Sequence, residues 1–235
     1  MSPSKLFVKA AWHNLILVTY AIDPVLLKPY FPRDCEPDMI EGKAFVSFVA
    51  FEFLNTTVLG IKIPFHSEFT EINLRYYLKK NNIRGVAFIK ELVPKTMVTL
   101  VAKLLYNEPY QTVEMEYEKK LENGILSLKH SVIQPNKKQI VSVVADYDKR
   151  FTPPNNSLEH FFKEHEVGYG KTRSNKPLTY RVEHPVWEIM PVKKYKMAVD
   201  FGLLYGQNWA FLNGQEPYNV AVAVGSEIKV FSAVI

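Results

Sequence analysis

Polar side chains occupy every second position of the segment FTEINLRYYL, residues 69–78: Glu71, Asn73, Arg75 and Tyr77. Side chains of a β-strand alternate between its two faces. The segment therefore predicts a strand with one apolar face and one face that carries an acid, an amide, a guanidinium and a phenol. Such a row can face water, form a hydrogen-bonded network within the core, or line a pocket for a polar ligand.

Arg75 determines what this row could bind. An arginine keeps its positive charge in a protein, so a buried guanidinium must find an anion. That anion is Glu71, another acid of the protein, or the carboxylate of a ligand. In the ligand interpretation Arg75 holds a small anion, Asn73 and Tyr77 complete the binding site, and Glu71 moves protons. In the alternative interpretation the row is a structural network.

Lys95 is a second candidate, because it follows Pro94 in ELVPK at a predicted strand-to-helix junction. A lysine that forms an imine with a carbonyl substrate must be neutral near pH 7, so its pKa must fall by about 3–4. Burial or a neighbouring cation produces such a fall, but the next residue is Thr96, which carries no charge. Lys95 is either a covalent catalyst or an exposed lysine in a first helical turn.

His184 and Trp187, in VEHPVWEI, form the third candidate. Pro185 restricts the backbone between them, and an indole beside an imidazole shields it from water. The pair predicts either a pocket wall in which His184 exchanges protons, or a core histidine packed on a tryptophan.

No metal or nucleotide site is predicted. His160 and His165 are five residues apart, off the spacing that would bring them together on one helix face. The sequence has no HExxH, CxxC, GxSxG or GxGxxG motif and no complete P-loop. Metalloprotease, serine hydrolase, Rossmann oxidoreductase and nucleotidase functions therefore lose their usual support. We expect no metal ion and no cofactor.

The composition is that of one globular domain over residues 1–235, with 47% hydrophobic and 23% charged residues. The formal charge of +5 comes largely from scattered or paired lysines beside turns and acids, so it does not indicate nucleic-acid binding.

The apolar run LILVTYAI, residues 15–22, is too short to span a bilayer, and the first residues do not have the pattern of a signal peptide. Cys35 is the only cysteine, so no internal disulfide is expected. A cytoplasmic protein without a membrane partner is the default expectation, and the sequence is compatible with a homo-oligomer without specifying one.

The elements that must position these side chains are mostly strands. Asn123-Gly124 predicts a type I′ hairpin turn, Asp23 and Ser157 are helix-capping residues, and Pro24 and Pro94 suit first helical turns. Strands are expected over 42–54, 69–78, 85–92, 111–120, 125–133, 178–189 and 219–234, and short helices within 23–32, 94–105 and 157–165. This pattern favours a largely antiparallel, barrel-like β fold with a few short helices.

Five segments also carry a family resemblance. They are WHNL near the start, IEGKAFVSFVAF at 40–51, FTEINLRYY at 69–77, LYNEPY at 105–110 and VEHPVW at 182–187. In this order the chain resembles the YqjF-like family of uncharacterised bacterial proteins, over nearly its whole length. The family is grouped with acetoacetate decarboxylase by fold. The resemblance therefore implies a closed antiparallel β-barrel or cone with an interior cavity and peripheral helices, but no established reaction.

The decarboxylase pattern can be compared at one position. That enzyme carries Glu-Leu and then Pro-Lys-Lys; its first lysine forms the imine and its second lowers the pKa of the first. ELVPKT keeps Glu91, Leu92, Pro94 and Lys95, but Thr96 replaces the second lysine. Imine formation by Lys95 would therefore depend on burial alone.

Two hypotheses of different classes follow. In the first, the protein is a lyase-like or decarboxylase-like enzyme for a small carbonyl or carboxylate compound, with Arg75 holding the anion, Glu71 or His184 moving protons and Lys95 as a covalent participant. In the second, it binds a metabolite without turning it over.

Overall fold

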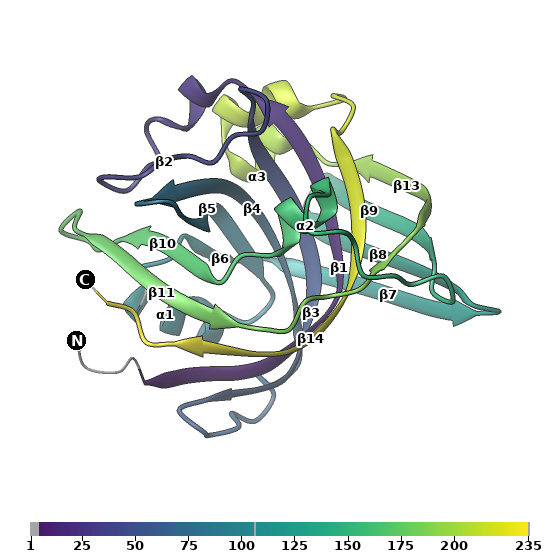
Figure 1. The fold of residues 1–235 in the computed structure, drawn as a ribbon. Helices are drawn as coiled ribbons and strands as arrows, with labels where there is room; N and C mark the ends of the chain where they lie inside the picture. The colour runs from purple at the N-terminus through teal and green to yellow at the C-terminus, as the bar shows by residue number, and fades with distance from the viewer. Residues whose placement is uncertain (1–4, 106, 235) are drawn as a thin grey trace.

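The computed structural model describes residues 5–105 and 107–234 and is built mainly from strands (Figure 1). The strands are β1 Leu6–Ile22, β2 Glu36–Pro37, β3 Ala44–Val58, β4 Phe69–Lys80, β5 Ile83–Val93, β6 Tyr110–Thr112, β7 Glu114–Glu122, β8 Ile125–Gln134, β9 Lys137–Asp146, β10 Val167–Lys171, β11 Pro177–Glu183, β12 Ile189–Met190, β13 Val192–Ala198 and β14 Asn219–Phe231. The helices are α1 Thr96–Leu105, α2 Leu158–Lys163, α3 Phe201–Tyr205 and the 3-10 turns η1 Pro24–Leu27 and η2 Gln207–Leu212. The predicted class, mainly β with a few short helices, is confirmed.

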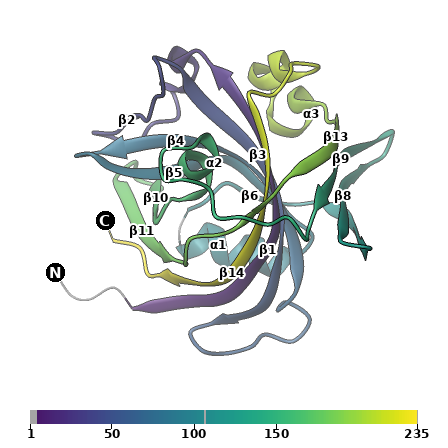
Figure 2. The same cartoon turned by 45° about the vertical axis from the view of Figure 1, so that its right-hand side comes forward.

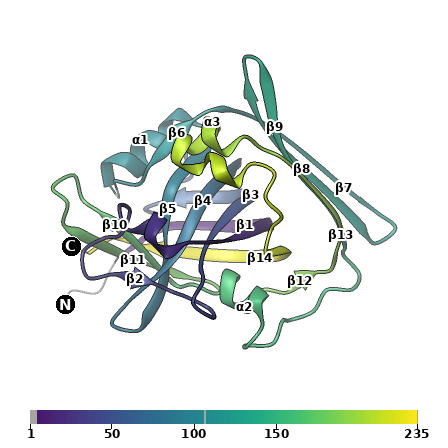
Figure 3. The ribbon, with the colours of Figure 1, turned by 90° about the horizontal axis from the view of Figure 1, so that it is seen from above.

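The strands form two sheets. The larger has the order β2-β4-β3-β1-β14-β11-β10-β5-β6, with β12 paired to β14 and an additional pairing of β4 with β5. In Figure 2, β14 runs beside β1, its antiparallel partner. The smaller sheet has the order β13-β9-β8-β7; Figure 3 shows it on one side of the molecule and α1 on the other. Most pairings are antiparallel as expected, but β5 pairs in parallel with both β6 and β10.

Strand β4 lies between two hydrophobic clusters, which explains why its polar row does not face water. Ile72, Leu74 and Tyr76 belong to one cluster, which also contains residues of the smaller sheet and of α3. Tyr77 and Phe69, on the opposite face, belong to the other. The predicted period of two is therefore correct, and both faces of the strand are covered.

Local signals fixed several other elements. Asn123 and Gly124 have φ values of 48° and 73°, as a type I′ turn requires, and they connect β7 to β8. The side chain of Asp23 accepts a hydrogen bond from the Val25 amide before η1, and Ser157 accepts one from the His160 amide at the start of α2.

One predicted strand was wrong in its extent. The expected strand over 178–189 is divided into β11 and β12, and residues 184–188 between them are irregular. Pro185 has no backbone N–H for a sheet hydrogen bond, which accounts for the interruption. His184 and Trp187 therefore lie in the segment that connects β11 to β12.

Within residues 5–105 and 107–234, none of the helices combines the length and the apolar character needed to cross a membrane.

Candidate functional site

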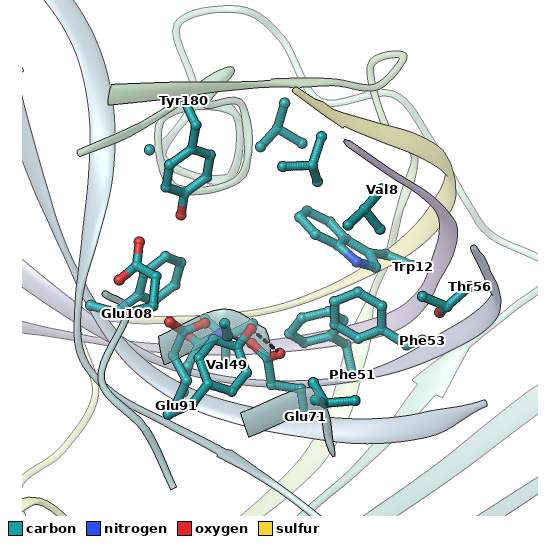
Figure 4. A pocket seen from close by; sticks show the side chains of 18 of the residues that line it. Val8, Trp12, Val49, Phe51, Phe53, Thr56, Glu71, Glu91, Glu108 and Tyr180 are labelled. Carbon is teal, nitrogen blue, oxygen red and sulfur yellow. Dashed lines mark hydrogen bonds between the residues drawn. The ribbon is translucent and has the colours of Figure 1, made fainter. Parts of the chain in front are cut away.

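A pocket of about 200 Å³ lies on the face of the larger sheet that carries the polar row of β4 (Figure 4). Most of its wall is apolar: Val8, Trp12, Val49, Phe51, Phe53, Phe69, Val86, Phe88, Val98, Val101, Val182 and Val230 contribute to it. Figure 4 shows Glu71, Glu91 and Glu108 with Tyr180 on one side and Trp12, Phe53 and Thr56 on the other. The pocket thus combines an apolar wall with a few polar groups, as small-molecule sites commonly do.

Glu71 is held by two donors. Asn73 donates from Nδ2 to Glu71 Oε1 at 2.9 Å, and the hydroxyl of Tyr110 donates to Glu71 Oε2 at 2.8 Å. Glu71 is 2% exposed. Burial raises the pKa of Glu71 to about 7, although the hydrogen bonds from Asn73 and Tyr110 act in the opposite direction.

Two further glutamates join Glu71 through strand pairing. Glu91 of β5 is opposite Asn73 of β4, and it is also paired with Tyr110 of β6. Glu108 precedes β6 by two residues, and its backbone carbonyl accepts from the Tyr110 amide at 2.8 Å. The pairing of β4, β5 and β6 therefore gathers three carboxyl groups at one end of the pocket, which we call the acidic end (Glu71, Glu91 and Glu108).

Burial strongly favours the neutral form of these carboxyl groups. It raises the pKa of Glu108 to about 8, against an opposing hydrogen bond from Tyr180. Burial, followed by the charges of Glu71 and Glu108, raises the pKa of Glu91 well above its ordinary value. Three adjacent buried carboxyls cannot all be ionised, so the acidic end holds protons near neutral pH.

Several buried oxygen atoms of the acidic end have no hydrogen-bond partner among the described residues. They are Asn73 Oδ1, Glu91 Oε1 and Glu108 Oε1. Buried polar atoms are normally paired, so unpaired atoms in a pocket wall indicate where a ligand or water would bind.

Arg75 does not pair with Glu71. Its Nη2 donates to the carbonyl oxygen of Phe162 at 2.6 Å, and its guanidinium lies 5.6 Å from the centre of the Tyr77 ring. Its Nε atom is buried and has no partner within the part of the chain that the structure describes. Arg75 lines the pocket with an unused donor.

His165 supplies a second unused donor near Arg75. Arg84 Nη2 lies 3.4 Å from His165 Nε2. A guanidinium only donates, so we assign the imidazole proton to Nδ1. This Nδ1 is buried without a partner among the described residues. Burial, reinforced by the charges of Arg75 and Arg84, lowers the pKa of His165 well below its ordinary value, which keeps the ring neutral.

His184 and Trp187 form a stacked pair in the pocket wall. Their ring centroids are 4.1 Å apart with an interplanar angle of 21°. His184 Nδ1 lies 2.9 Å from the Pro185 carbonyl, and Trp187 Nε1 donates to Ser226 Oγ at 2.8 Å. The His184 side chain is only 2% exposed, so the tryptophan shields the imidazole as the sequence suggests.

Lys163, at the end of α2, also lines the pocket. Its side chain is 1% exposed, and its Nζ forms an ion pair with Glu164. A buried lysine must be paired or neutral, and here a carboxylate is present.

The structure brings together five of the seven predicted site residues. Glu71, Asn73, Arg75, His184 and Trp187 line the pocket, and their functional roles stay predictions.

The other two, Tyr77 and Lys95, are not among its lining residues. The Tyr77 hydroxyl lies 2.5 Å from Ser47 Oγ and donates to the Phe162 carbonyl at 3.3 Å, within the core. Lys95 is half-buried just before α1, where its carbonyl accepts from the Thr99 amide at 3.2 Å.

Among the described residues that line the pocket, eight polar ones were not predicted: Thr56, His66, Glu91, Glu108, Tyr110, Lys163, His165 and Tyr180. Glu108 and Tyr110 belong to LYNEPY, a segment that carries the family resemblance, and Glu91 belongs to ELVPK, the segment compared with the decarboxylase pattern. Their participation depends on the parallel pairing of β5 with β6, which no local pattern predicts.

Sequence comparisons found similarity to uncharacterized proteins. The family model DUF2071, described as an uncharacterized conserved protein, matches residues 9–227. The YqjF protein of Bacillus subtilis (strain 168), also described as uncharacterized, is 24% identical over 183 residues, which are 77% of this chain and 74% of that protein.

Solved structures show the same fold at low identity. A structure of acetoacetate decarboxylase has a TM-score of 0.66 at 12% identity, over 97% of this chain and 88% of that chain. The enduracididine biosynthesis enzyme MppR complexed with pyruvate has a TM-score of 0.65 at 11% identity, over 98% of this chain and 90% of that chain. Identities this low show a shared fold and do not transfer an activity.

Proposed function

The chain belongs to the DUF2071 family of uncharacterized conserved proteins, and from this membership and the pocket geometry we propose that it binds a small carbonyl or carboxylate metabolite. The ligand would sit in the pocket between the acidic end and Arg75. Proteins with a similar fold include acetoacetate decarboxylase and MppR in complex with pyruvate. Acetoacetate and pyruvate, which these descriptions name, are small carbonyl compounds that carry a carboxylate.

The observation that carries this proposal is that Arg75 has no carboxylate partner among the described residues. This residue is a half-buried cation in the pocket wall, with one nitrogen unpaired among the described residues. The Nδ1–H of His165 is a second unpaired donor, and His165 is near enough for the charge of Arg75 to lower its pKa. Two unpaired donors, one of them charged, fit a carboxylate.

We further propose that the larger sheet closes around the pocket. From β4 the sheet continues through β3, β1, β14, β11 and β10 to β5. Strand β5 also pairs with β4, so the first and last strands of this series are neighbours. A closed sheet has no free edge along this path, and it would separate the pocket from the second sheet.

Arg75→Met is expected to weaken the binding of an anionic ligand by about 10–100-fold, since a hydrogen bond to a charged group contributes about 1.5–3 kcal/mol. Ligands would first be found by thermal-shift screening of small keto acids and carboxylates. Isothermal titration calorimetry would then measure the affinity of each hit for the wild type and the variant.

Arg181→Met is the matched control, because Arg181 is exposed on β11 and pairs with Glu183. This variant should bind the same anion as tightly as the wild type. Equal affinity in Arg75→Met and wild type would show that Arg75 is structural and would overturn the proposal.

Lyase-like turnover of a keto acid is a second candidate, favoured by a lysine in the pocket wall. Imine formation needs an amine that reaches the ligand carbonyl, where a C=N bond forms and water leaves. Lys163 lines the pocket, whereas Lys95 is not among its lining residues. Lys163 is therefore the better placed of the two lysines.

Borohydride trapping tests this candidate. With a panel of 2- and 3-keto acids, we expect a single reduced adduct by intact mass, present in Lys95→Ala and absent in Lys163→Ala. An adduct lost only in Lys95→Ala would restore Lys95 as the imine lysine. No adduct with any keto acid would exclude imine formation by either lysine and would leave the binding proposal unchanged.

A further inference from the structure

Apart from Trp12 Nε1 and Thr56 Oγ1, the unpaired polar atoms of the described pocket residues differ in kind between two polar regions. At the acidic end they are oxygens, namely Asn73 Oδ1, Glu91 Oε1 and Glu108 Oε1, and all three accept hydrogen bonds when the two carboxyls are ionised. Near Arg75 the unpaired atoms are donors, namely Arg75 Nε and the Nδ1–H of His165. An anion satisfies the donors but leaves the three acceptors without partners.

No cation among the described residues pairs with the carboxyl groups of the acidic end. Lys163, the lysine in the pocket wall, pairs with Glu164. Arg84 pairs with Asp38, and His184 Nδ1 lies 3.9 Å from Glu164 Oε2. The groups that shift the pKa values of the three glutamates are the glutamates themselves, Asn73, Tyr110 and Tyr180. Carboxyl groups that are buried without a cation either remain protonated or ionise when a ligand supplies a cation.

We propose that the acidic end binds a positively charged, hydrogen-bond-donating nitrogen of the ligand, an ammonium or guanidinium group. This inference rests on the proposed function, because it concerns the same pocket, and it narrows the ligand class to compounds with a carboxylate at one end and a cationic nitrogen at the other. An ammonium brings three N–H donors, one for each unpaired acceptor.

A metal ion is a less suitable source of the charge. Among the described residues, no three His, Cys, Asp or Glu side chains are arranged to hold one. The apolar wall of the pocket also fits the methylene chain of an organic cation.

The spacing of the two regions follows from β4. Glu71 and Arg75 are four residues apart on one strand face, which separates their Cα atoms by about 13 Å. Both side chains extend into the same pocket, so a ligand with a short methylene chain between its charges would reach both.

Binding of a cation is expected to release protons from the acidic end. Near neutral pH this end holds protons, and a cationic nitrogen favours the ionised carboxylates. The titratable groups that face one another here are Glu71 of β4, Glu91 of β5, Glu108 before β6, Tyr110 of β6 and Tyr180 of β11, with Tyr205 of α3 close enough to feel the charge of Glu71.

The experiment compares ω-amino acids of three to six methylenes with alkanoates of the same length and with alkylamines. Titration calorimetry at pH 7 in buffers of different ionisation enthalpy measures affinity and proton release together. We expect the best ω-amino acid to bind at least 10-fold tighter than its alkanoate and to release protons.

Variants separate the two polar regions. Glu108→Gln and Glu91→Gln should remove the advantage of the amino group and leave alkanoate affinity within a few fold. Arg75→Met should weaken alkanoates and ω-amino acids but not alkylamines. Should a glutamine variant fail to fold, the wild-type comparison of matched ligands still decides the question.

Two results would overturn this inference. Equal affinity of ω-amino acids and alkanoates would mean that the acidic end does not bind a cation. Proton uptake on binding would mean that its carboxyls donate to an acceptor of the ligand instead. A third result separates the two proposals. If alkylamines bound but alkanoates and other carboxylates did not, the proposed function would be refuted, and the binding of a cation at the acidic end would still hold.

Discussion

Glu108→Gln is expected to become steadily more stable relative to the wild type as the pH rises from 5 to 9, by about 3–5 kcal/mol in the free energy of unfolding. The reason is the burial of Glu108, which raises its pKa to about 8 in the folded protein. Each pKa unit between the folded and unfolded states corresponds to about 1.4 kcal/mol. Urea unfolding at five pH values would measure the effect.

The direction follows from proton binding. Below the ordinary carboxyl pKa near 4.5, Glu108 is protonated in both states and the raised pKa contributes its full stabilisation. Between that value and about 8, only the folded state holds the proton, so stability falls as the pH rises. Glutamine has a similar shape and no titrating proton, so the variant lacks this loss.

Glu114→Gln is the control, because Glu114 is an exposed residue of β7. This variant should run parallel to the wild type across the pH range. A Glu108→Gln variant that also ran parallel to the wild type would show that Glu108 is ionised at neutral pH. Such a result would show that Glu108 is not one of the groups that hold protons at the acidic end.

Gly225→Ala is expected to destabilise the fold by at least about 4 kcal/mol, or to prevent folding. Gly225 has a φ of 86° and pairs with His13 of β1. An added Cβ would lie 1.9 Å from the Trp12 carbonyl oxygen, a backbone atom that moves only with β1 itself. Backbone strain and a steric overlap in the centre of a sheet combine here.

Gly214→Ala separates the two contributions. Gly214 has a φ of 73°, but an added Cβ would meet no atom within 4 Å. This variant should cost about 1–2 kcal/mol, the price of a left-handed backbone alone. Thermal and urea unfolding of both variants would measure the difference, and similar losses at the two positions would show that β1 and β14 adjust to the extra methyl group.

Part of the pocket could be predicted because its signals are local. The alternation in FTEINLRYYL placed Glu71, Asn73 and Arg75 on one strand face, and the structure puts all three in the pocket wall. His184 and Trp187 are three residues apart in the sequence, and their stacking needs only a short connecting segment.

The acidic end could not be predicted in the same way. Glu71, Glu91 and Glu108 are separated by 20 and 17 residues in the sequence, and they meet because β5 pairs with β4 on one side and with β6 on the other. A parallel pair such as β5–β6 has no hairpin turn to reveal it. The prediction of Lys95 does not match the pocket lining, which contains Lys163 instead, because a sequence pattern does not show which lysine lies inside.

The sequence by itself determined the strand character of residues 69–78, the hairpin at Asn123-Gly124, the caps at Asp23 and Ser157, and the family. These features depend on alternation, backbone φ preferences and side-chain-to-backbone hydrogen bonds among close neighbours. Only the tertiary structure decided that Arg75 contacts the Phe162 carbonyl rather than Glu71, and that Glu71 joins two other buried acids. Such partners are chosen by strand register and packing across the sheet, which are properties of the whole fold.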